Sequence, residues 1–160
     1  GHRMEEQLEE TSFEGSGAYQ AYIKSCDDLQ IHANSQVIII LKNAPAVGPV
    51  LDFSRNYLGD RGVVALAEGL RLCVDSITEV NLHGCGVRNN GMTALCDVFK
   101  GSNLRVLDIS RNDISARGCQ NILELIKATP SLELLDFRYN KLMRADDKLR
   151  IQQAMARGKK

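Results

Sequence analysis

Cysteine and histidine are two of the side-chain types that can hold a metal ion or act as nucleophile and base. The five cysteines, Cys26, Cys73, Cys85, Cys96 and Cys119, include no pair at the CxxC spacing that zinc sites use. Their odd number also disfavours a framework of disulfides. We therefore expect reduced, buried thiols that pack as small apolar side chains, and we expect neither a metal site nor a cofactor.

Catalytic motifs are absent from the sequence. It contains no phosphate-binding loop, no GxSxG and no HExxH. The three histidines, His2, His32 and His83, lie far apart in the chain. The sequence therefore predicts that the protein is not an enzyme.

The composition excludes two kinds of partner. Acidic and basic residues balance at 20 each, and tryptophan is absent, whereas proteins that bind nucleic acid concentrate basic residues and often add aromatic stacking surfaces. The longest apolar run, Val37 to Leu41, is far too short to cross a bilayer. The acidic stretch after Met4 is unlike a secretory signal. We expect a cytoplasmic protein that binds neither nucleic acid nor membrane.

An internal repeat supplies the elements that must position any binding residues. Four copies of one pattern begin at Leu51, Val80, Leu107 and Leu135, 27 to 29 residues apart. Each copy opens with alternating apolar residues, which is the spacing of a strand. This regularity over four copies indicates stacked, equivalent units.

Each copy then changes to helical spacing. A glycine follows in three copies, at Gly62, Gly91 and Gly118, and the apolar residues after it recur at helical intervals, as in residues 63–70. One repeat is therefore predicted to be a short strand, a turn and a helix of about three turns. Because a single repeat cannot bury its own apolar face, the repeats must stack on one another.

A small polar residue follows each predicted strand: Asn56, Cys85, Asn112 and Asn140. An Asn side chain at a sharp turn can bond the main-chain groups that the turn leaves inside, and stacking would align these side chains into a ladder. The thiol of Cys85 is a weaker donor, but it is small and easily buried.

These residues resemble the leucine-rich-repeat family, in particular its longer repeats of the ribonuclease-inhibitor type. The pattern LxxLxLxx(N/C)xLxxxG is matched from Ile77 to Gly91 and again from Leu104 to Gly118, and the likeness extends over residues 48–142. Gly48 stands at the first consensus leucine, and the fourth copy lacks the glycine. The resemblance implies an α/β fold: a right-handed solenoid in a short horseshoe arc, with parallel strands on the concave face and helices on the convex face.

Four segments are expected. They are a disordered acidic N-terminus that begins with a tag remnant (residues 1–16), a helical N-terminal cap (17–47), four repeats (48–142), and a C-terminal cap helix with a basic tail (143–160). Within the N-terminal cap, the β-branched run Val37 to Leu41 fits either a strand or a helix. Paired segments of this kind precede the repeats in intracellular members of the family, which favours a helix.

The candidate binding residues lie in the predicted strands, between the buried positions, because alternation sends these side chains to the concave face. They are Asp52, Arg55, Glu79, Asn81, His83, Asp108, Arg111, Asp136, Arg138 and Tyr139. Strand spacing places equivalent residues about 5 Å apart, which makes a compact panel. Arginine and tyrosine often carry interface energy, but Asp–Arg neighbours could instead simply pair and solvate the sheet.

We therefore expect a module or scaffold that binds a partner protein, of unknown identity, through its concave face. Members of the resembled family with helical N-terminal segments occur in cytoskeletal, ciliary and centrosomal proteins, which suggests such a location. The same resemblance offers an alternative, a regulator of a small GTPase similar to the GTPase-activating proteins of the Ran system. Self-association through an exposed solenoid end is also open.

Overall fold

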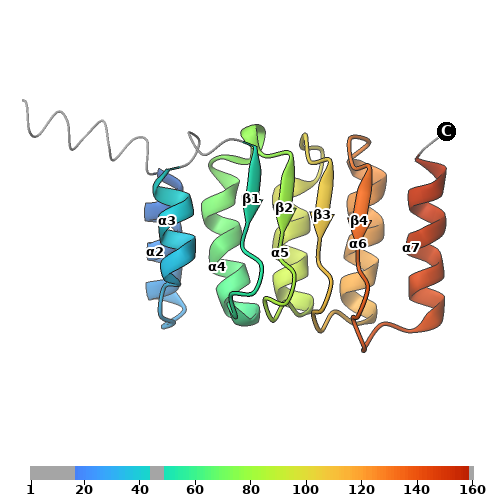
Figure 1. Cartoon of the computed structure of the whole chain (residues 1–160), viewed down its shortest axis with the longest axis horizontal. Coiled ribbons are helices and arrows are strands. Elements are labelled where there is room, and N and C mark those ends of the chain that lie inside the picture. The colour runs from blue at the N-terminus through green and yellow to red at the C-terminus, as the bar shows by residue number, and fades with distance from the viewer. Residues whose placement is uncertain (1–16, 44–48, 159–160) are drawn as a thin grey trace, which may run out of the picture.

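The computed structural model describes residues 17–43 and 49–158. Its elements in chain order are α2 (Gly17–Asp28), α3 (Ser35–Lys42), β1 (Val50–Asp52), α4 (Gly59–Arg71), the 3-10 helix η1 (Val74–Ser76), β2 (Glu79–Asn81), α5 (Asn89–Phe99), β3 (Val106–Asp108), α6 (Ala116–Ala128), β4 (Leu134–Asp136) and α7 (Ala145–Arg157). The strands form one parallel sheet in the order β1-β2-β3-β4 (Figure 1). The expectations for residues 1–16, 44–48 and 159–160 lie outside the described residues.

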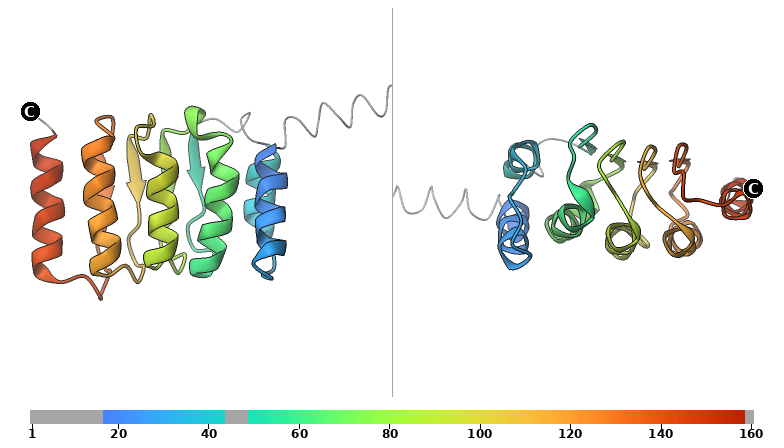
Figure 2. Two further views of the ribbon diagram at one scale, coloured as in Figure 1. Left: turned by 180° about the vertical axis from the view of Figure 1, so that it is seen from behind. Right: turned by 90° about the horizontal axis from the view of Figure 1, so that it is seen from below.

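Strands and helices form two layers. The four strands line one side, and α4, α5 and α6 line the other (Figure 2). Strand pairing follows the register of the repeat, because Leu51 lies opposite Val80, Val80 opposite Leu107, and Leu107 opposite Leu135. The predicted α/β solenoid is thereby confirmed. No helix in the described part of the chain is long and apolar enough to cross a membrane.

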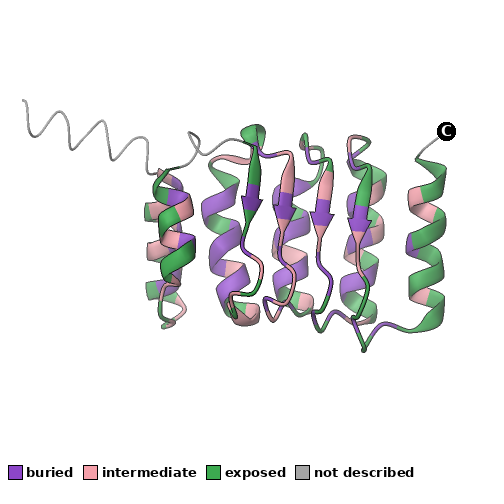
Figure 3. Ribbon diagram, viewed as in Figure 1, coloured by how far each residue is buried: buried purple, intermediate pink, exposed green. Residues whose placement is uncertain are grey.

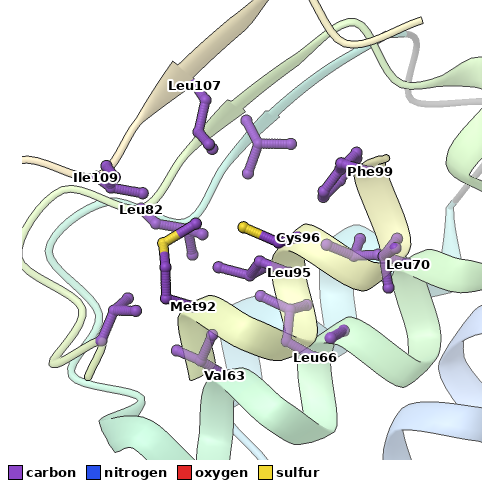
Figure 4. Close-up of a cluster of buried hydrophobic side chains, with 14 of the residues drawn as sticks. Val63, Leu66, Leu70, Leu82, Met92, Leu95, Cys96, Phe99, Leu107 and Ile109 are labelled. Atoms are coloured by element: carbon purple, nitrogen blue, oxygen red, sulfur yellow. The ribbon is translucent and has the colours of Figure 1, made fainter. Parts of the chain in front are cut away.

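The core fills the space between the two layers. Met92 and Leu95 of α5 lie among Leu66 of α4 and the strand-side residues Leu82 and Leu107 (Figure 4). Each of these five side chains is at most 1% exposed. The core is therefore shared between repeats, as a stack of units that cannot fold singly requires.

A pair of helices closes the first end of the stack. The Oδ1 atom of Asn34 accepts the N–H groups of Gln36 and Val37 at 2.9 and 3.1 Å and so begins α3. The run from Val37 to Leu41 is therefore helical and not a strand. In Figure 2, α3 extends the strand layer beyond β1, and α2 extends the helix layer beside α4.

One helix, α7, covers the other end. It lies beyond β4 and α6, at a level between the two layers (Figure 2), and it is exposed along most of its length (Figure 3). Ile151 is its single buried residue, and Leu149 is 52% exposed. The predicted C-terminal helix is present, but it contributes little buried surface.

The asparagine ladder is present, and Asn112 is its most fully bonded member. Its Oδ1 atom accepts the N–H groups of Cys85 and Val87 at 3.1 and 2.9 Å. Its Nδ2 atom donates to the carbonyl oxygens of Leu82 and Ile109 at 2.9 and 3.0 Å. Asn112 thus satisfies buried main-chain groups of its own repeat and of the repeat before it.

Cys85 fills its rung of the ladder in a different way. Its thiol donates to the carbonyl oxygen of Phe53 at 3.1 Å. A thiol is a poor substitute for the accepting oxygen of asparagine. The main-chain carbonyl of Cys85 takes that role and accepts the N–H groups of Leu58 and Gly59 at 3.0 Å each.

A second set of bonds joins the helix starts of neighbouring repeats. The Oδ1 atom of Asp60 in α4 accepts two N–H groups at the start of α5, including that of Gly91 at 2.7 Å. The Oδ1 atom of Asn89 in α5 does the same at the start of α6, including the N–H group of Gly118 at 3.0 Å. These two helices are therefore capped by the repeat that precedes them.

The interrepeat caps explain the glycine in two of its three copies, Gly91 and Gly118. A Cβ atom on Gly91 would lie 2.7 Å from Oδ1 of Asp60, and the equivalent pair in the next repeat is equally close. The glycine lies inside the first turn of the helix, whereas the change of spacing placed the helix after it. In α6 the position equivalent to Asp60 and Asn89 holds Ala116, which has no oxygen to offer as a cap. In α7 the position equivalent to Gly91 and Gly118 holds Asp146.

We expect Gly91→Ala to lower the free energy of unfolding by about 1–3 kcal/mol, although alanine favours helices, because the new methyl group collides with Asp60. Asp60→Ala should cost about 1 kcal/mol through the lost cap. The double variant should lose less than the sum, because the obstructing carboxylate is gone. Urea denaturation of the four proteins measures this coupling, and strictly additive losses would contradict the steric explanation.

Candidate protein-binding surface

The outward-facing strand residues form the rows that the repeat predicts. Asp52 lies opposite Asn81, Asn81 opposite Asp108, and Asp108 opposite Asp136. In each strand the middle residue is buried and its two neighbours are exposed or half-buried. The candidate residues within the strands therefore share one face of the sheet.

The side chains of the row formed by Asp52, Asn81, Asp108 and Asp136 accept hydrogen bonds from the main chain. The Oδ1 atom of Asp52 accepts the N–H group two residues further on, that of Ser54, at 2.9 Å. The same bond is made by Asn81, Asp108 and Asp136 at 2.9, 2.9 and 3.1 Å. These side chains stabilise the bend after each strand, a structural role that alternation alone did not reveal.

His83 belongs to a short chain of hydrogen bonds. Its Nδ1 atom lies 2.7 Å from Oγ of Ser110, and that hydroxyl donates to Oδ1 of Asp108 at 2.5 Å. A nucleophilic serine would give its proton to the histidine, whereas here the serine proton points to the aspartate. The arrangement orients the imidazole at the concave face and does not activate the serine.

The row that follows the strands has left-handed backbone in all four repeats. The φ angles are 63° at Arg55, 64° at Gly84, 53° at Arg111 and 61° at Tyr139. Glycine adopts such angles freely, but for other residues this conformation costs roughly 1–2 kcal/mol of free energy. Three repeats therefore keep a large, exposed side chain where the second repeat shows that glycine fits.

Three side chains of the panel meet at its C-terminal half, and we call them the arginine–tyrosine cluster: Arg111, Arg138 and Tyr139. The guanidinium carbon of Arg111 lies 4.7 Å from the centre of the Tyr139 ring, and that of Arg138 lies 5.9 Å from it. Arg138 also donates to both carboxylate oxygens of Asp136, at 3.0 and 2.8 Å, which lowers the pKa of that carboxyl. The cluster is therefore ordered by its own contacts.

The structure brings some of the predicted residues together and leaves others apart. Arg55 lies beside β1, about 10 Å from Arg111 and about 15 Å from Tyr139 by strand spacing, and Glu79 is half-buried at the start of β2. Lys141 lines an open hollow of about 280 Å³ beside the cluster, together with Arg111 and Tyr139. Sequence reasoning missed Lys141 because it lies in the turn beyond the strand, where alternation has ended.

The cysteines lie mostly in the core. Cys26, Cys85, Cys96 and Cys119 are buried, while Cys73 is half-buried beyond the end of α4. Desolvation by burial raises the pKa of Cys85 and Cys96 to about 12 and that of Cys119 to about 11. Thiols with such pKa values hold almost no thiolate at neutral pH and react slowly. Within residues 17–43 and 49–158, no three His, Cys, Asp or Glu side chains gather as metal ligands.

We expect Arg55→Gly to leave the free energy of unfolding unchanged or to raise it by up to about 1 kcal/mol, because glycine relieves the left-handed backbone. Gly84→Ala should lower it by about 1 kcal/mol, and a Cβ atom there meets nothing within 4 Å, so the cost comes from the backbone alone. Urea denaturation measures both variants. A substantial loss in Arg55→Gly would show that this arginine stabilises the fold.

Similarity to known proteins agrees with the repeat pattern. Residues 50–67, 76–96 and 102–123 match the family described as Leucine Rich repeat. The chain is 36% identical over 78 residues to ribonuclease inhibitor of Mus musculus, which covers 48% of this chain and 17% of the relative. It is 30% identical over 86 residues to NACHT, LRR and PYD domains-containing protein 13 of Homo sapiens, which covers 53% of this chain and 8% of the relative. The chain thus spans less than a fifth of the length of either relative.

A solved structure shares the fold. The structure described as leiomodin-1 actin-binding site 2 superposes with a TM-score of 0.52 at 13% sequence identity, over 78% of this chain and 87% of that one. At this level of identity the likeness concerns the fold alone. Together with the strand register and the ladder, these findings show that the chain contains leucine-rich repeats, which are similar to those of ribonuclease inhibitor.

Proposed function

We propose that the protein is an interaction module that binds a partner protein through the concave face of its sheet. The arginine–tyrosine cluster is the proposed anchor, because arginine and tyrosine are the residue types that most often dominate interface energy. The remaining candidates, from Asp52 at one end of the sheet to Asp136 at the other, would form the polar surroundings of that anchor.

The observation that carries the proposal is the left-handed backbone at Arg111 and Tyr139. The turn after each strand imposes this angle in all four repeats, and glycine would adopt it without the cost that arginine and tyrosine bear. Such costs are concentrated at functional sites. Tyr139 is 58% exposed, so its ring adds little to the buried core. A residue that costs stability and contributes little packing is best explained by a contact made outside the chain.

The cluster also suggests what a partner would offer. Arg138 is already paired with Asp136, whereas Arg111 and Lys141 have no ion-pair partner among the described residues. A carboxylate on the partner could therefore bind between Arg111 and Lys141 while an apolar side chain covers Tyr139. His83 follows β2, two strands from β4, and its half-buried imidazole would contact the partner through a hydrogen bond.

The cellular setting belongs to the proposal as well. A cytoskeletal, ciliary or centrosomal role is in keeping with the fold of the leiomodin-1 domain, which is described as an actin-binding site. No contact or charge pattern among the described residues favours the regulation of a GTPase. We therefore retain the scaffold as the proposed function.

We expect the double variant Arg111→Glu with Arg138→Glu to lose its partner, because it reverses two charges of the anchor and removes both guanidinium groups from the Tyr139 ring. Recovery of the partner in pull-downs from the native cell should fall by about tenfold or more. Mass spectrometry of the recovered proteins also tests the proposed cellular location, because the double variant should recover fewer cytoskeletal proteins than the unaltered protein does.

Lys24→Glu with Arg150→Glu is the matched control. Lys24 in α2 and Arg150 in α7 are exposed, lie outside the sheet, and change the net charge by the same amount. The control should recover the partner as well as the unaltered protein does. Undiminished recovery by the concave-face variant would contradict the proposal.

A further inference from the structure

The sheet ends at β4 with main-chain donors that continue a regular series. The N–H group of Phe53 donates to Asn81, that of Leu82 to Asp108, and that of Ile109 to Asp136, each to the carbonyl of the next strand at 2.8 to 2.9 Å. The next member of this series is the N–H group of Phe137.

A second series ends beside the first. The N–H group of Arg55 donates to the carbonyl of His83, that of Gly84 to Ser110, and that of Arg111 to Arg138, at 2.9 to 3.1 Å. Tyr139 comes next. No hydrogen bond within the described part of the chain uses the N–H group of Phe137 or of Tyr139. These two donors point to where a fifth strand would lie.

The side chain of Phe137 is also incompletely covered. It is half-buried, whereas Phe53, Leu82 and Ile109, its equivalents in the three preceding repeats, are each 0% exposed. The difference arises because the stack ends here and α7 contributes only Ile151 as a buried side chain. A further layer beside β4 would bury Phe137 as fully as its equivalents.

An open groove occupies this place. It has a volume of about 690 Å³ and runs between β4 and its turn on one side, including Leu134, Phe137 and Tyr139, and Lys148 and Gln152 of α7 on the other. Its volume falls within the range of sites that bind small ligands. An exposed strand edge next to an apolar groove is the geometry in which sheets accept an additional strand.

We infer that the groove between β4 and α7 binds an extended segment of a partner protein as a fifth strand. The N–H groups of Phe137 and Tyr139 donate to carbonyl oxygens of that segment. Apolar side chains of the segment cover Phe137. Acidic side chains of the segment face Lys148, which has no ion-pair partner among the described residues and lies on the α7 wall of the groove. The partner segment is therefore extended, with alternating apolar and acidic residues.

The groove adjoins the concave surface and shares Asp136, Arg138 and Tyr139 with it, whereas Lys148 and Gln152 belong to the groove alone. Variants at these two residues therefore test the groove separately. The probe is a synthetic ten-residue peptide in which valine and glutamate alternate, with a valine–lysine peptide as its counterpart. Proton–nitrogen NMR spectra of the full chain should show the amide protons of Phe137 and Tyr139 shifting downfield and exchanging more slowly with solvent when the glutamate peptide is added. The lysine peptide should bind at least about fivefold more weakly.

Paired variants on α7 locate the binding. Lys148→Glu should weaken the glutamate peptide by about five- to tenfold, whereas Arg150→Glu, on the same helix outside the groove, should change its affinity less than about twofold. Gln152→Trp should block the groove, and Gln153→Trp, which is exposed but does not line it, should not. All four positions are exposed, so these variants should unfold at the urea concentration of the unaltered protein.

Three results would overturn the inference. They are unchanged Phe137 and Tyr139 amides in the presence of the peptide, equal affinity for the two peptides, and equal effects of the variants inside and outside the groove. Protection of the same amides that rises with protein concentration, without peptide, would instead assign the groove to a second copy of this chain. None of these variants changes Arg111, Arg138 or Tyr139, so failure here leaves the concave-face proposal standing.

Discussion

The need to satisfy buried main-chain groups at the turn after each strand governs this structure. The turn brings peptide groups into the core, where an unpaired N–H or carbonyl costs about 1–3 kcal/mol. Asn112 meets this need with one side chain that bonds both its own repeat and the preceding one. The ladder thereby fixes the spacing of the strands, and the strand spacing in turn sets how the concave residues lie against one another.

The same logic operates at the helix starts, with different residues. Each α-helix leaves its first N–H groups without partners inside the helix, and Asp60 and Asn89 supply oxygens from the neighbouring repeat. Ladder and caps thus join adjacent repeats at two separate places, while the apolar core joins them in between. Stability in such a stack comes from these neighbour interfaces, so its ends are its weakest parts. The two ends differ, because α2 and α3 extend both layers whereas α7 stands between them.

Most of the architecture could be predicted from the sequence, because it depends on periodicity. Strand register, helix positions and the ladder all follow from residues that recur every 27–29 positions. The binding surface could be predicted only in part. Alternation placed Asp108 and Asp136 on the concave face, but it could not show that their carboxylates bond the backbone two residues further on. Periodicity says which face a side chain occupies, and hydrogen bonding decides what remains available to a partner.

Some of the missing information was present in the sequence in another form. Gly84 stands in a row with Arg55, Arg111 and Tyr139, and a glycine in one copy of a repeat indicates a backbone angle that the other copies must share. The pairing of Asp60 with Gly91 and of Asn89 with Gly118 could also have been inferred from the sequence, because each capping residue precedes its glycine by about one repeat. The groove beside β4 was not, because it arises from the end of the repeats and has no period.

The interrepeat cap has a consequence for how such an array can grow. Each cap and its glycine lie in consecutive repeats, so a repeat is compatible with its neighbours only if it carries both halves. The unit around α5 carries both, with Gly91 to receive Asp60 and Asn89 to serve the unit that follows. A tandem duplication of that unit would join to itself without a mismatch. The unit around α6 has Gly118, so its helix can be capped by the preceding unit. It has Ala116 at the capping position, so it cannot cap the helix of a following unit. Lengthening of this solenoid by gene duplication is therefore easier from its interior than from its last repeat.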